Sequence, residues 1–374
     1  MRKTYKFRIY PTKPQIRQME RSLEVCRHVY NRTLAERKQV YEETGKTLSK
    51  YTLNNLLPQW KADNPEYNEV FSQTLQEVQE RVDLAFKHFF RRVKNGEKPG
   101  YPRFKGKGWY DSFTYPQMGF KLKDDHIYLS KIGDVYVKFH RQIEGNIKRV
   151  TVRRTSCTKW YVSLIIEPED IPTPIVDLNK VIGIDVGLSS FLTMSDGDNV
   201  SNPRFFKAEE KELARVQRKL SQTVKGTTDR QKAIKVVQRV HERISNKRYD
   251  FAHQISRFLV DKYSFIAFED LNIKNMIRDP QYSKSIADVS WNMLITATKY
   301  KAESAGKIVV LVNPYNTSQM CSKCGLIVKK TINNRIHKCD SCGLALDRDY
   351  NAAINILRLG LQSVGIKSVE ARRL

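Results

Sequence analysis

Two cysteine pairs near the C-terminal end of the chain have the spacing of metal ligands. They form the motifs Cys321-x-x-Cys324 and Cys339-x-x-Cys342, and a glycine directly follows each pair. Two such turns can present four thiolates to one tetrahedral Zn²⁺ ion. A disulfide or two unrelated pairs is the alternative interpretation, but the doubled pattern with matching glycines favours one structural zinc site.

Three acidic residues lie in or beside apolar segments. Asp185 interrupts an apolar strand, Glu269 ends a second apolar strand, and Asp349 lies at the start of an Ala-rich helix behind the cysteines. An acid inside an apolar strand is costly unless it has a partner or a metal ion. The last acid is ambiguous, because Asp347 is placed equally well and an acid here can simply cap the helix.

The order of the expected elements places these acids together. From residue 176 the pattern is strand, strand, helices, strand, helix, strand and helix, which is the order of an RNase H-like fold, in which such carboxylates converge. Converging carboxylates cannot all stay ionised without a cation, and hard oxygen ligands select Mg²⁺ or Mn²⁺. Two such ions about 4 Å apart would support in-line phosphodiester hydrolysis, in which one lowers the pKa of the attacking water and the other stabilises the leaving 3′ oxygen.

The charge balance indicates a polyanionic partner. The 374 residues include 66 Lys plus Arg against 40 Asp plus Glu, a formal net charge of +26. Nucleic acid is the default partner for such an excess. The chain has no apolar run of membrane-spanning length and no apolar signal core at its N-terminus. We therefore expect a protein that is cytoplasmic, binds no membrane and associates with the nucleoid when it acts.

The N-terminal half predicts a strand, a helical bundle and a small barrel. Residues 4–10 alternate basic and apolar side chains, as a half-buried strand does, and apolar stripes predict helices over 13–43, 53–60 and 69–93. Short alternating strands follow from residue 112 to 167 and suggest an antiparallel barrel. The first strand is expected to join that barrel, so that the helical bundle is an insertion.

Two basic segments are candidates for contact with nucleic acid. The loop over residues 96–109 interleaves basic side chains, among them Arg103 and Lys105, with aromatic ones, which suits phosphate contact and base stacking. A long basic linker is the alternative. Two helices over 206–224 and 229–262 are rich in Lys and Arg, and Arg239, Arg243 and Lys247 are the candidates there. A solvated helical face would explain the same pattern.

Several motifs together resemble the TnpB (OrfB) family of insertion sequences. They include YKFRIYPTKPQ at the N-terminus, GYPRFKGK, GIDVGLSSF, FEDLNIKNM and CGLALDRDYNAAINI, so the resemblance covers nearly the whole chain. By this resemblance Asp185, Glu269 and Asp349 are the RuvC-type catalytic carboxylates and ligands of two Mg²⁺ or Mn²⁺ ions. The family positions are Asp349 rather than Asp347, and Glu269 rather than Asp270.

The resemblance also implies a fold and partners. The family is an RNA-guided DNA endonuclease, similar to compact type V CRISPR effectors, in which a guide RNA from the transposon end pairs with double-stranded target DNA. One RuvC site cuts both strands next to a short target-adjacent motif, and we expect a monomer when RNA is bound. Gln76 and Thr114 match the positions that read this motif, since Gln can bond adenine and Thr can touch a thymine methyl group.

The implied fold class is multidomain α+β, with five regions. They are a wedge β-barrel (1–10 and 100–172), a helical recognition bundle (11–99), an RNase H-like RuvC nuclease domain (176–312 and 346–362), an inserted zinc ribbon that binds target nucleic acid (313–345) and a C-terminal tail (363–374).

Three other functions remain open from the residues. A nuclease-inactive, RNA-guided DNA-binding repressor would require loss of the acids, which are intact here. A DNA strand transferase would use a similar fold to join a free 3′ end to target DNA. A structural or transcription factor with a zinc ribbon would leave the three acids unexplained.

Overall fold

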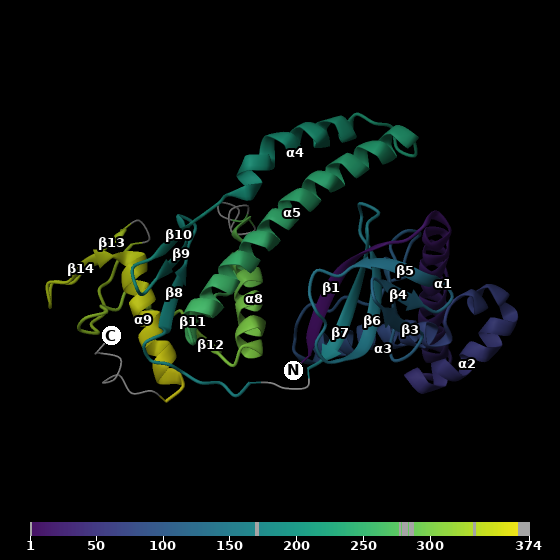
Figure 1. Cartoon of the computed structure of the whole chain (residues 1–374), viewed down its shortest axis with the longest axis horizontal. Helices are drawn as coiled ribbons and strands as arrows, with labels where there is room; N and C mark the ends of the chain where they lie inside the picture. The colour runs from purple at the N-terminus through teal and green to yellow at the C-terminus, as the bar shows by residue number, and fades with distance from the viewer. Residues whose placement is uncertain are drawn as a thin grey trace. The chain divides into compact units, whose positions relative to one another are not determined.

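The computed structural model describes residues 2–168, 172–276, 278, 283, 288–331 and 334–365 (Figure 1). The chain forms two compact units, residues 1–169 and 170–374. Most of the expected tail, from residue 366 on, lies outside the described residues. Among the helices described, none is long and apolar enough to cross a membrane.

The first unit is built on one antiparallel sheet. Its order is β2-β6-β7-β1-β5-β4-β3, and β1 pairs with both β5 and β7. The first strand therefore joins this sheet, as the sequence predicted. Alternate residues of β1 are buried, with Phe7 and Ile9 in the core. The seven strands are β1 Lys3–Tyr10, β2 Ser112–Tyr115, β3 Phe120–Lys123, β4 His126–Leu129, β5 Gly133–Lys138, β6 Asn146–Arg154 and β7 Trp160–Glu167.

Chain connectivity forces this sheet to curl into a nearly closed barrel. Strands β2 and β3 are its two edges, yet only the residues between Tyr115 and Phe120 join them. Six steps of about 4.8 Å would separate the edges of a flat sheet by about 29 Å. Five residue steps reach at most about 18 Å. The edges must therefore approach each other, which agrees with the predicted barrel.

The helices of the first unit are inserted between β1 and β2. They are α1 Lys13–Thr44, α2 Lys50–Asp63, the 3-10 turn η1 Pro65–Glu69 and α3 Ser72–Lys94. A capping box between Thr12 and Gln15 starts α1, and Gly45 ends it in the left-handed conformation. The helix predicted from residue 69 begins three residues later, because Val70 is extended and packs into the core.

The second unit is built on a mixed five-stranded sheet. Its order is β10-β9-β8-β11-β12, in which β8, β9 and β10 are antiparallel and β8, β11 and β12 are parallel. The strands are β8 Val181–Val186, β9 Ser190–Met194, β10 Asn199–Ser201, β11 Phe265–Glu269 and β12 Ile308–Val312. All five residues of β11 are buried, as a central parallel strand requires.

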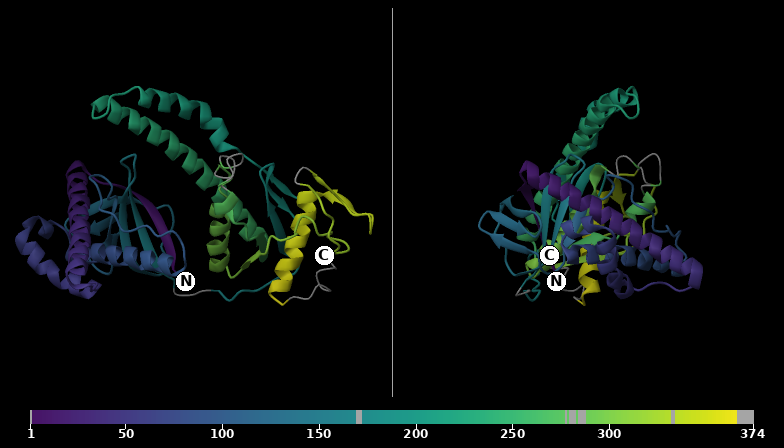
Figure 2. Two further views of the ribbon diagram at one scale, coloured as in Figure 1. Left: turned by 180° about the vertical axis from the view of Figure 1, so that it is seen from behind. Right: turned by 90° about the vertical axis from the view of Figure 1, so that its right-hand side faces the viewer.

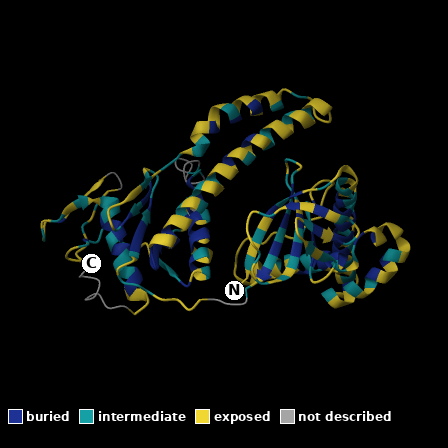
Figure 3. Ribbon diagram, viewed as in Figure 1, coloured by how far each residue is buried: buried dark blue, intermediate teal, exposed yellow. Residues whose placement is uncertain are grey.

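Helices and a small ribbon complete the second unit. The helices are α4 Phe205–Ser221, α5 Thr228–Lys262, α6 Ile273–Met276, α8 Trp291–Ser304 and α9 Arg348–Ser363, and the ribbon strands are β13 Ile336–Lys338 and β14 Ala345–Asp347. Helices α4 and α5 form an antiparallel hairpin with a small core of its own and a largely exposed surface (Figures 2 and 3).

Helix α9 lies in direct backbone contact with β8. A Cβ atom on Gly183 would stand 2.2 Å from the carbonyl oxygen of Ala353 and 2.5 Å from the backbone nitrogen of Leu357. Only glycine allows this approach. Because Asp185 follows Gly183 on β8 and Asp349 precedes Ala353 on α9, this contact fixes how far apart the two acids can lie.

We predict that Gly183→Ala displaces α9 and destabilises the second unit. The added methyl group meets backbone atoms that cannot rotate away, so the cost should be about 1–3 kcal/mol or more. Urea unfolding of the full chain measures it. Gly100→Ala, where a Cβ atom meets open space, is the matched control. Equal stability of the two variants would contradict the close contact.

Candidate active site and metal centre

Asp347 and Asp349, which the residues alone did not distinguish, have different roles at the start of α9. The Asp347 carboxylate accepts backbone hydrogen bonds from Asp349 and Tyr350 at 2.9 and 3.0 Å, so it is the N-cap of the helix. Asp349 lies in the first turn, and its side chain is free of that capping role. The capping explanation therefore applies to Asp347, and Asp349 is the acid that faces the other two.

The three predicted carboxylates lie close enough to perturb one another. Burial raises the pKa of Asp185 well above its usual range, and the negative charges of Glu269 and Asp349 raise it further. Burial likewise raises the pKa of Glu269, against a hydrogen bond from Thr317, and the charge of Asp349 adds to the rise. The structure therefore brings Asp185, Glu269 and Asp349 together beside the carboxyl ends of β8 and β11, which is called the carboxylate edge below.

Thr317 holds the buried Glu269 in place. Its hydroxyl donates to Glu269 Oε1, and both residues are less than 9% exposed. The neighbouring acid Asp270 is exposed, and its backbone N–H donates to the carbonyl of Val312 at 2.8 Å. Strand alternation thus directs Glu269 into the site and Asp270 away from it, which agrees with the position that the family resemblance favours.

Two arginines approach Asp349. Arg348 Nη2 lies 3.0 Å from Asp349 Oδ1, and Arg335 Nη1 lies 3.4 Å from Oδ2. Arg335 precedes β13 of the ribbon, so the ribbon contributes a cation to the edge where the acids gather. Because Arg335 is 57% exposed, its guanidinium can turn toward a phosphate without leaving a buried charge behind.

The four cysteines form a compact thiol cluster. Within the described residues they are the one set of potential metal ligands whose donor atoms all lie within 4.8 Å of one another. The Sγ atoms of Cys321 and Cys342, and those of Cys324 and Cys339, are 3.6 Å apart. A disulfide would need about 2.05 Å, whereas a tetrahedral zinc ion with Zn–S bonds of about 2.3 Å places its ligands about 3.8 Å apart.

The two cysteine turns have the same internal geometry. Gly325 N–H donates to Cys321 O at 2.9 Å, and Gly343 N–H donates to Cys339 O at 2.9 Å. Both glycines have positive φ, 81° and 73°. This repeated geometry and the sulfur spacing fit a structural zinc ion, for which four thiolates are a complete ligand set.

Two buried asparagines attach the first cysteine turn to α9. Asn351 Nδ2 donates to Met320 O at 2.8 Å, and Asn351 Oδ1 accepts from Ser322 N at 3.0 Å. Asn355 Nδ2 donates to Met320 O and Thr317 O at 2.6 and 2.9 Å. Both side chains are fully buried. The same helix therefore positions Asp349 directly and Glu269 through Thr317.

The donor chemistry of the carboxylate edge fits divalent hard cations. The three acids offer only oxygen ligands, and Mg²⁺ or Mn²⁺ prefers such ligands. They are more widely spaced than the cysteines, since they do not form a set within 4.8 Å. A pair of ions about 4 Å apart accommodates a wider set of ligands than a single ion does.

Of the two residues predicted to read a target-adjacent motif, one is exposed and the other is buried. Gln76 is exposed and lines a recess of ≈ 190 Å³ with residues of α2, α3 and the β2–β3 loop. Thr114 is 2% exposed, accepts from Arg81 Nη2 at 2.8 Å and lies 2.9 Å from Thr151 Oγ1. Thr114 is therefore committed to internal contacts in this structure.

The predicted residues of the basic loop also differ. Lys105 exchanges two backbone hydrogen bonds with the Asn31 side chain, and its ammonium lies 5.7 Å from the centre of the Tyr30 ring. Arg103 is exposed. Lys105 thus fastens the loop to α1, whereas Arg103 projects from it.

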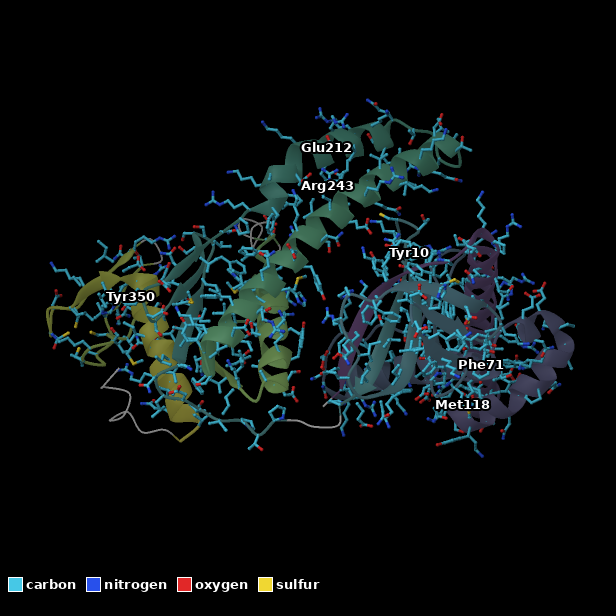
Figure 4. The ribbon with its side chains drawn as sticks, viewed as in Figure 1. Tyr10, Phe71, Met118, Glu212, Arg243 and Tyr350 are labelled. Atoms are coloured by element: carbon cyan, nitrogen blue, oxygen red, sulfur yellow. The ribbon has the colours of Figure 1, made fainter. Side chains whose placement is uncertain are left out.

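Of the three predicted residues on the α4–α5 hairpin, two form ion pairs within the hairpin and one is exposed. Arg243 and Lys247 lie 3.1 and 2.8 Å from the Glu209 carboxylate, and these pairs join α5 to α4. Figure 4 labels Arg243 on α5. Both cations keep about half of their side-chain surface in solvent. Arg239 is exposed one turn earlier. The ion pairs give Arg243 and Lys247 a structural role that the sequence pattern did not indicate.

Five residues that orient the acids were not among the predicted site residues. They are Thr317, Arg335, Arg348, Asn351 and Asn355. One signal was present, because Asn351 and Asn355 are four residues apart on a helix otherwise rich in Ala and Ile. Polar side chains at that spacing share a helix face, and on an apolar helix they need buried partners.

Three family models match successive parts of the chain. A model described as a probable transposase (OrfB of IS605) matches residues 163–279, and a Cas12f1-like TNB domain matches residues 291–356. A helix-turn-helix domain matches residues 1–46. In the described part of that last range the structure has β1 and the single helix α1, and no helical pair.

Two relatives match over nearly their whole length. A putative RNA-guided DNA endonuclease of Streptomyces pristinaespiralis is 31% identical over 369 residues, which cover 96% of this chain and 90% of the relative. The putative RNA-guided DNA endonuclease InsQ of Escherichia coli (strain K12) is 32% identical over 376 residues, covering 95% and 92%.

Solved structures of compact guided effectors share the fold. A chain of a Cas12f1–sgRNA–target DNA complex aligns with a TM-score of 0.56 at 16% identity, covering 95% of this chain and 98% of that one. CasPhi-2 (Cas12j) bound to crRNA aligns with a TM-score of 0.53 at 10% identity, covering 96% and 98%. These likenesses support a mixed α/β fold of this class.

We predict that Cys339→Ser releases zinc and loosens the start of α9. Without the metal ion the two cysteine turns lose their shared anchor. The contacts of Asn351 with the first turn and of Asn355 with Thr317 should weaken as a result. Metal analysis, thermal unfolding and nuclease assays of the full chain measure the effect. Cys157→Ser, outside the cluster, should keep zinc and activity. A folded, zinc-free variant that cleaves DNA normally would contradict this coupling.

We predict that Asp185→Asn stabilises the protein when no Mg²⁺ or Mn²⁺ is present and zinc is retained. The pKa of Asp185 is raised in the folded state. The unfolded chain therefore loses this proton first, and the free energy of unfolding falls as pH rises from the unfolded pKa of about 4 toward the raised folded pKa. The neutral amide removes this loss, so its gain in Tm should be larger at pH 8 than at pH 4.

Asp196→Asn is the matched control of opposite sign. Burial opposes ionisation there, but hydrogen bonds from Tyr263, the Asp198 backbone and Lys262 lower the pKa of Asp196. Its contribution is present above the unfolded pKa and disappears in acid, so this variant should lose stability at pH 8. Two variants that shift Tm in the same direction would contradict the assignment.

Proposed function

The chain belongs to the TnpB (OrfB) family, and from this premise we propose that it is an RNA-guided DNA endonuclease with one RuvC active site. Its full-length relatives carry the name RNA-guided DNA endonuclease. The proposal for the site rests on the convergence of the three acids: burial, and then the negative charges of Glu269 and Asp349, raise the pKa of Asp185. Its partners are a guide RNA and target DNA.

We assign the second unit to an RNase H-like RuvC nuclease domain with an inserted zinc ribbon. The sheet order β10-β9-β8-β11-β12 supports this, with acids on β8 and β11 and at the start of α9. We assign the zinc ribbon to residues 313–345, and its second strand β14 continues to Asp347, directly before α9 begins. Residues 1–10 and 100–172 are assigned to the wedge barrel, which extends three residues past the end of the first unit at residue 169, and residues 11–99 are assigned to the recognition bundle.

In the proposed reaction the three carboxylates hold two Mg²⁺ or Mn²⁺ ions. Such ions lower the pKa of the attacking water and stabilise negative charge on the leaving 3′ oxygen. Thr317 orients Glu269 by hydrogen bonding, and the α9–β8 contact sets the spacing of Asp349 and Asp185. Arg335 and Arg348 are placed to attract the scissile phosphate toward this edge.

We propose that the recess beside Gln76 contacts the target-adjacent motif. Among the described residues, Asn54 Oδ1 and Gln73 Oε1 lie buried without a hydrogen-bond partner, and both residues line this recess. Amide side chains bond base edges through paired donors and acceptors. Thr114 is bonded to Arg81, which pairs with Glu77 of the recess lining, and Thr114 makes no base contact in this proposal.

The five basic residues predicted to contact nucleic acid have different proposed roles. Arg103 and Arg239 are exposed and suited to backbone phosphates. Lys105, Arg243 and Lys247 chiefly fix the loop and the hairpin that carry these cations. The small bundle and barrel are consistent with a complex in which RNA supplies much of the structure.

The matched pair Asp349→Asn and Asp347→Asn tests the site. Asn is a good N-cap, so Asp347→Asn should keep cleavage within a few-fold. Asp349→Asn removes a ligand charge and should lower the cleavage rate by at least about a hundredfold. Both variants are purified from cells that carry the native locus, and the bound RNA is sequenced. A plasmid library with the matching target and randomised flanks is then cut in Mg²⁺.

The outcomes separate the competing functions. Flank-dependent linearisation that is lost in Asp349→Asn alone supports the guided nuclease and identifies its motif. A defined co-purifying RNA with target binding but no cutting by the wild type would support a repressor instead. Joining of a free 3′ end to the target would indicate a strand transferase.

A further inference from the structure

Four aromatic side chains project into solvent from the end of α3 and from the loop that follows it. Phe90, Tyr101, Phe104 and Trp109 are 46–81% exposed, and Trp109 is the most exposed of them. Rings of this size are usually buried or partnered, because each can bury 150–250 Å² or so of surface. Together with the cations around them, these four residues are called the aromatic–basic strip.

The strip is held on a fixed support. The loop is fastened to α1 where Lys105 exchanges hydrogen bonds of 2.8 and 3.0 Å with Asn31 and its carbonyl accepts from Arg27 Nη1 at 3.0 Å. The Phe104 ring lies 5.9 Å from Lys38 Nζ. Asn31 and Lys38 are seven residues apart on α1, or about 10 Å along its axis. The strip thus follows the helix.

Aromatic packing fixes the other end. Tyr101 lies edge-on to Phe86 and Phe89, with ring centres 5.6 and 5.4 Å apart, and Phe90 packs on the same pair at 6.3 and 5.2 Å. Phe86 is buried in the core. Tyr101 is held edge-on, and Phe90 is stacked on Phe86, yet about half of each side chain remains in solvent. Little side-chain entropy is left to lose when a flat ligand stacks on them.

The charge around the strip has one sign. Residues 87–109 contain eight Lys or Arg and one acid, Glu97, which gives a net charge of +7. Among the described residues, Lys87 pairs with Asp83, but no ion pair is found for Arg91, Arg92, Lys94, Lys98, Arg103 or Lys107. A ligand that neutralises these cations must carry repeated negative charge.

We propose that the aromatic–basic strip binds an unpaired segment of the guide RNA by stacking its bases. This inference rests on the proposed function, which supplies the RNA. Base faces are accessible only in single strands, and alternating rings and cations match the alternation of bases and phosphates. A duplex would present phosphates to the cations but leave the rings without partners.

Ring-specific variants of the full chain test the inference. Phe104→Leu, Trp109→Leu and the double variant keep the charge and apolar character but remove the stacking faces. Fluorescence anisotropy measures the Kd of a labelled single-stranded RNA of about 15 nucleotides, its duplex and the single-stranded DNA of the same sequence. Tyr128→Leu, an exposed ring on β4, is the matched control.

Each change should weaken single-stranded RNA binding by about fivefold or more, and the double variant more strongly. The salt dependence of binding should stay unchanged, because no charge is lost. Duplex binding and the Tyr128→Leu variant should stay within twofold of wild type. Cross-linking of 4-thiouridine RNA should label a peptide within residues 100–109 in the wild type and lose that label in the double variant.

Three results would overturn the inference. Unchanged RNA affinity in the double variant is one, equal losses for RNA duplex and single strand is another, and a loss confined to single-stranded DNA is the third. A guided-cleavage assay of the same wild-type preparation tells whether the inference about the strip or the proposed function has failed. If wild type cleaves and the double variant binds RNA normally, only the strip is wrong, whereas absence of guided cleavage in wild type contradicts the proposed function itself.

Discussion

The backbone contact between α9 and β8 is the constraint on which the candidate site depends. Gly183 lets the helix lie against the strand, and no larger residue fits between them. Asp185 and Asp349 are carried on these two elements, so their separation follows from that contact. The contact also explains why the residues between them on α9 are small, since Ala352 and Ala353 are fully buried there. A second glycine, Gly360, repeats the close approach further along the helix, where a Cβ atom would meet Ala267 at 2.6 Å.

Helix α9 connects the carboxylate site to the first cysteine turn. Near its N-terminal turn, burial and the neighbouring negative charges raise the pKa values of Asp185 and Glu269. Through Asn351 and Asn355 the helix also holds the turn that carries Cys321 and Thr317. The turn that carries the first cysteine pair is thereby fixed to the helix that carries Asp349. Raised pKa values such as those of Asp185 and Glu269 are typical of catalytic centres.

The sequence was sufficient for the elements whose patterns are long and for the ligands whose spacing is local. The helix predicted over 13–43, which the structure has as 13–44, follows from an apolar stripe. The joining of the first strand to the barrel follows from alternation, and the cysteine cluster follows from Cys-x-x-Cys spacing. Asp347 and Asp349 could not be separated by residue type, because the difference is which carboxylate caps the helix. The packing of Lys105 on Asn31 and the pairing of Arg243 with Glu209 depend on segments that are distant in sequence. The catalytic and nucleic-acid roles of the individual residues stay predictions.

Anomalous diffraction from crystals soaked in Mn²⁺ tests the central claim most directly, because it locates the metal ions and their ligands at once. Data collected at the manganese and zinc edges distinguish the two sites. The account predicts manganese bound by Asp185, Glu269 and Asp349, and zinc bound by the four cysteines. Manganese at other residues in a preparation that cleaves DNA would contradict it.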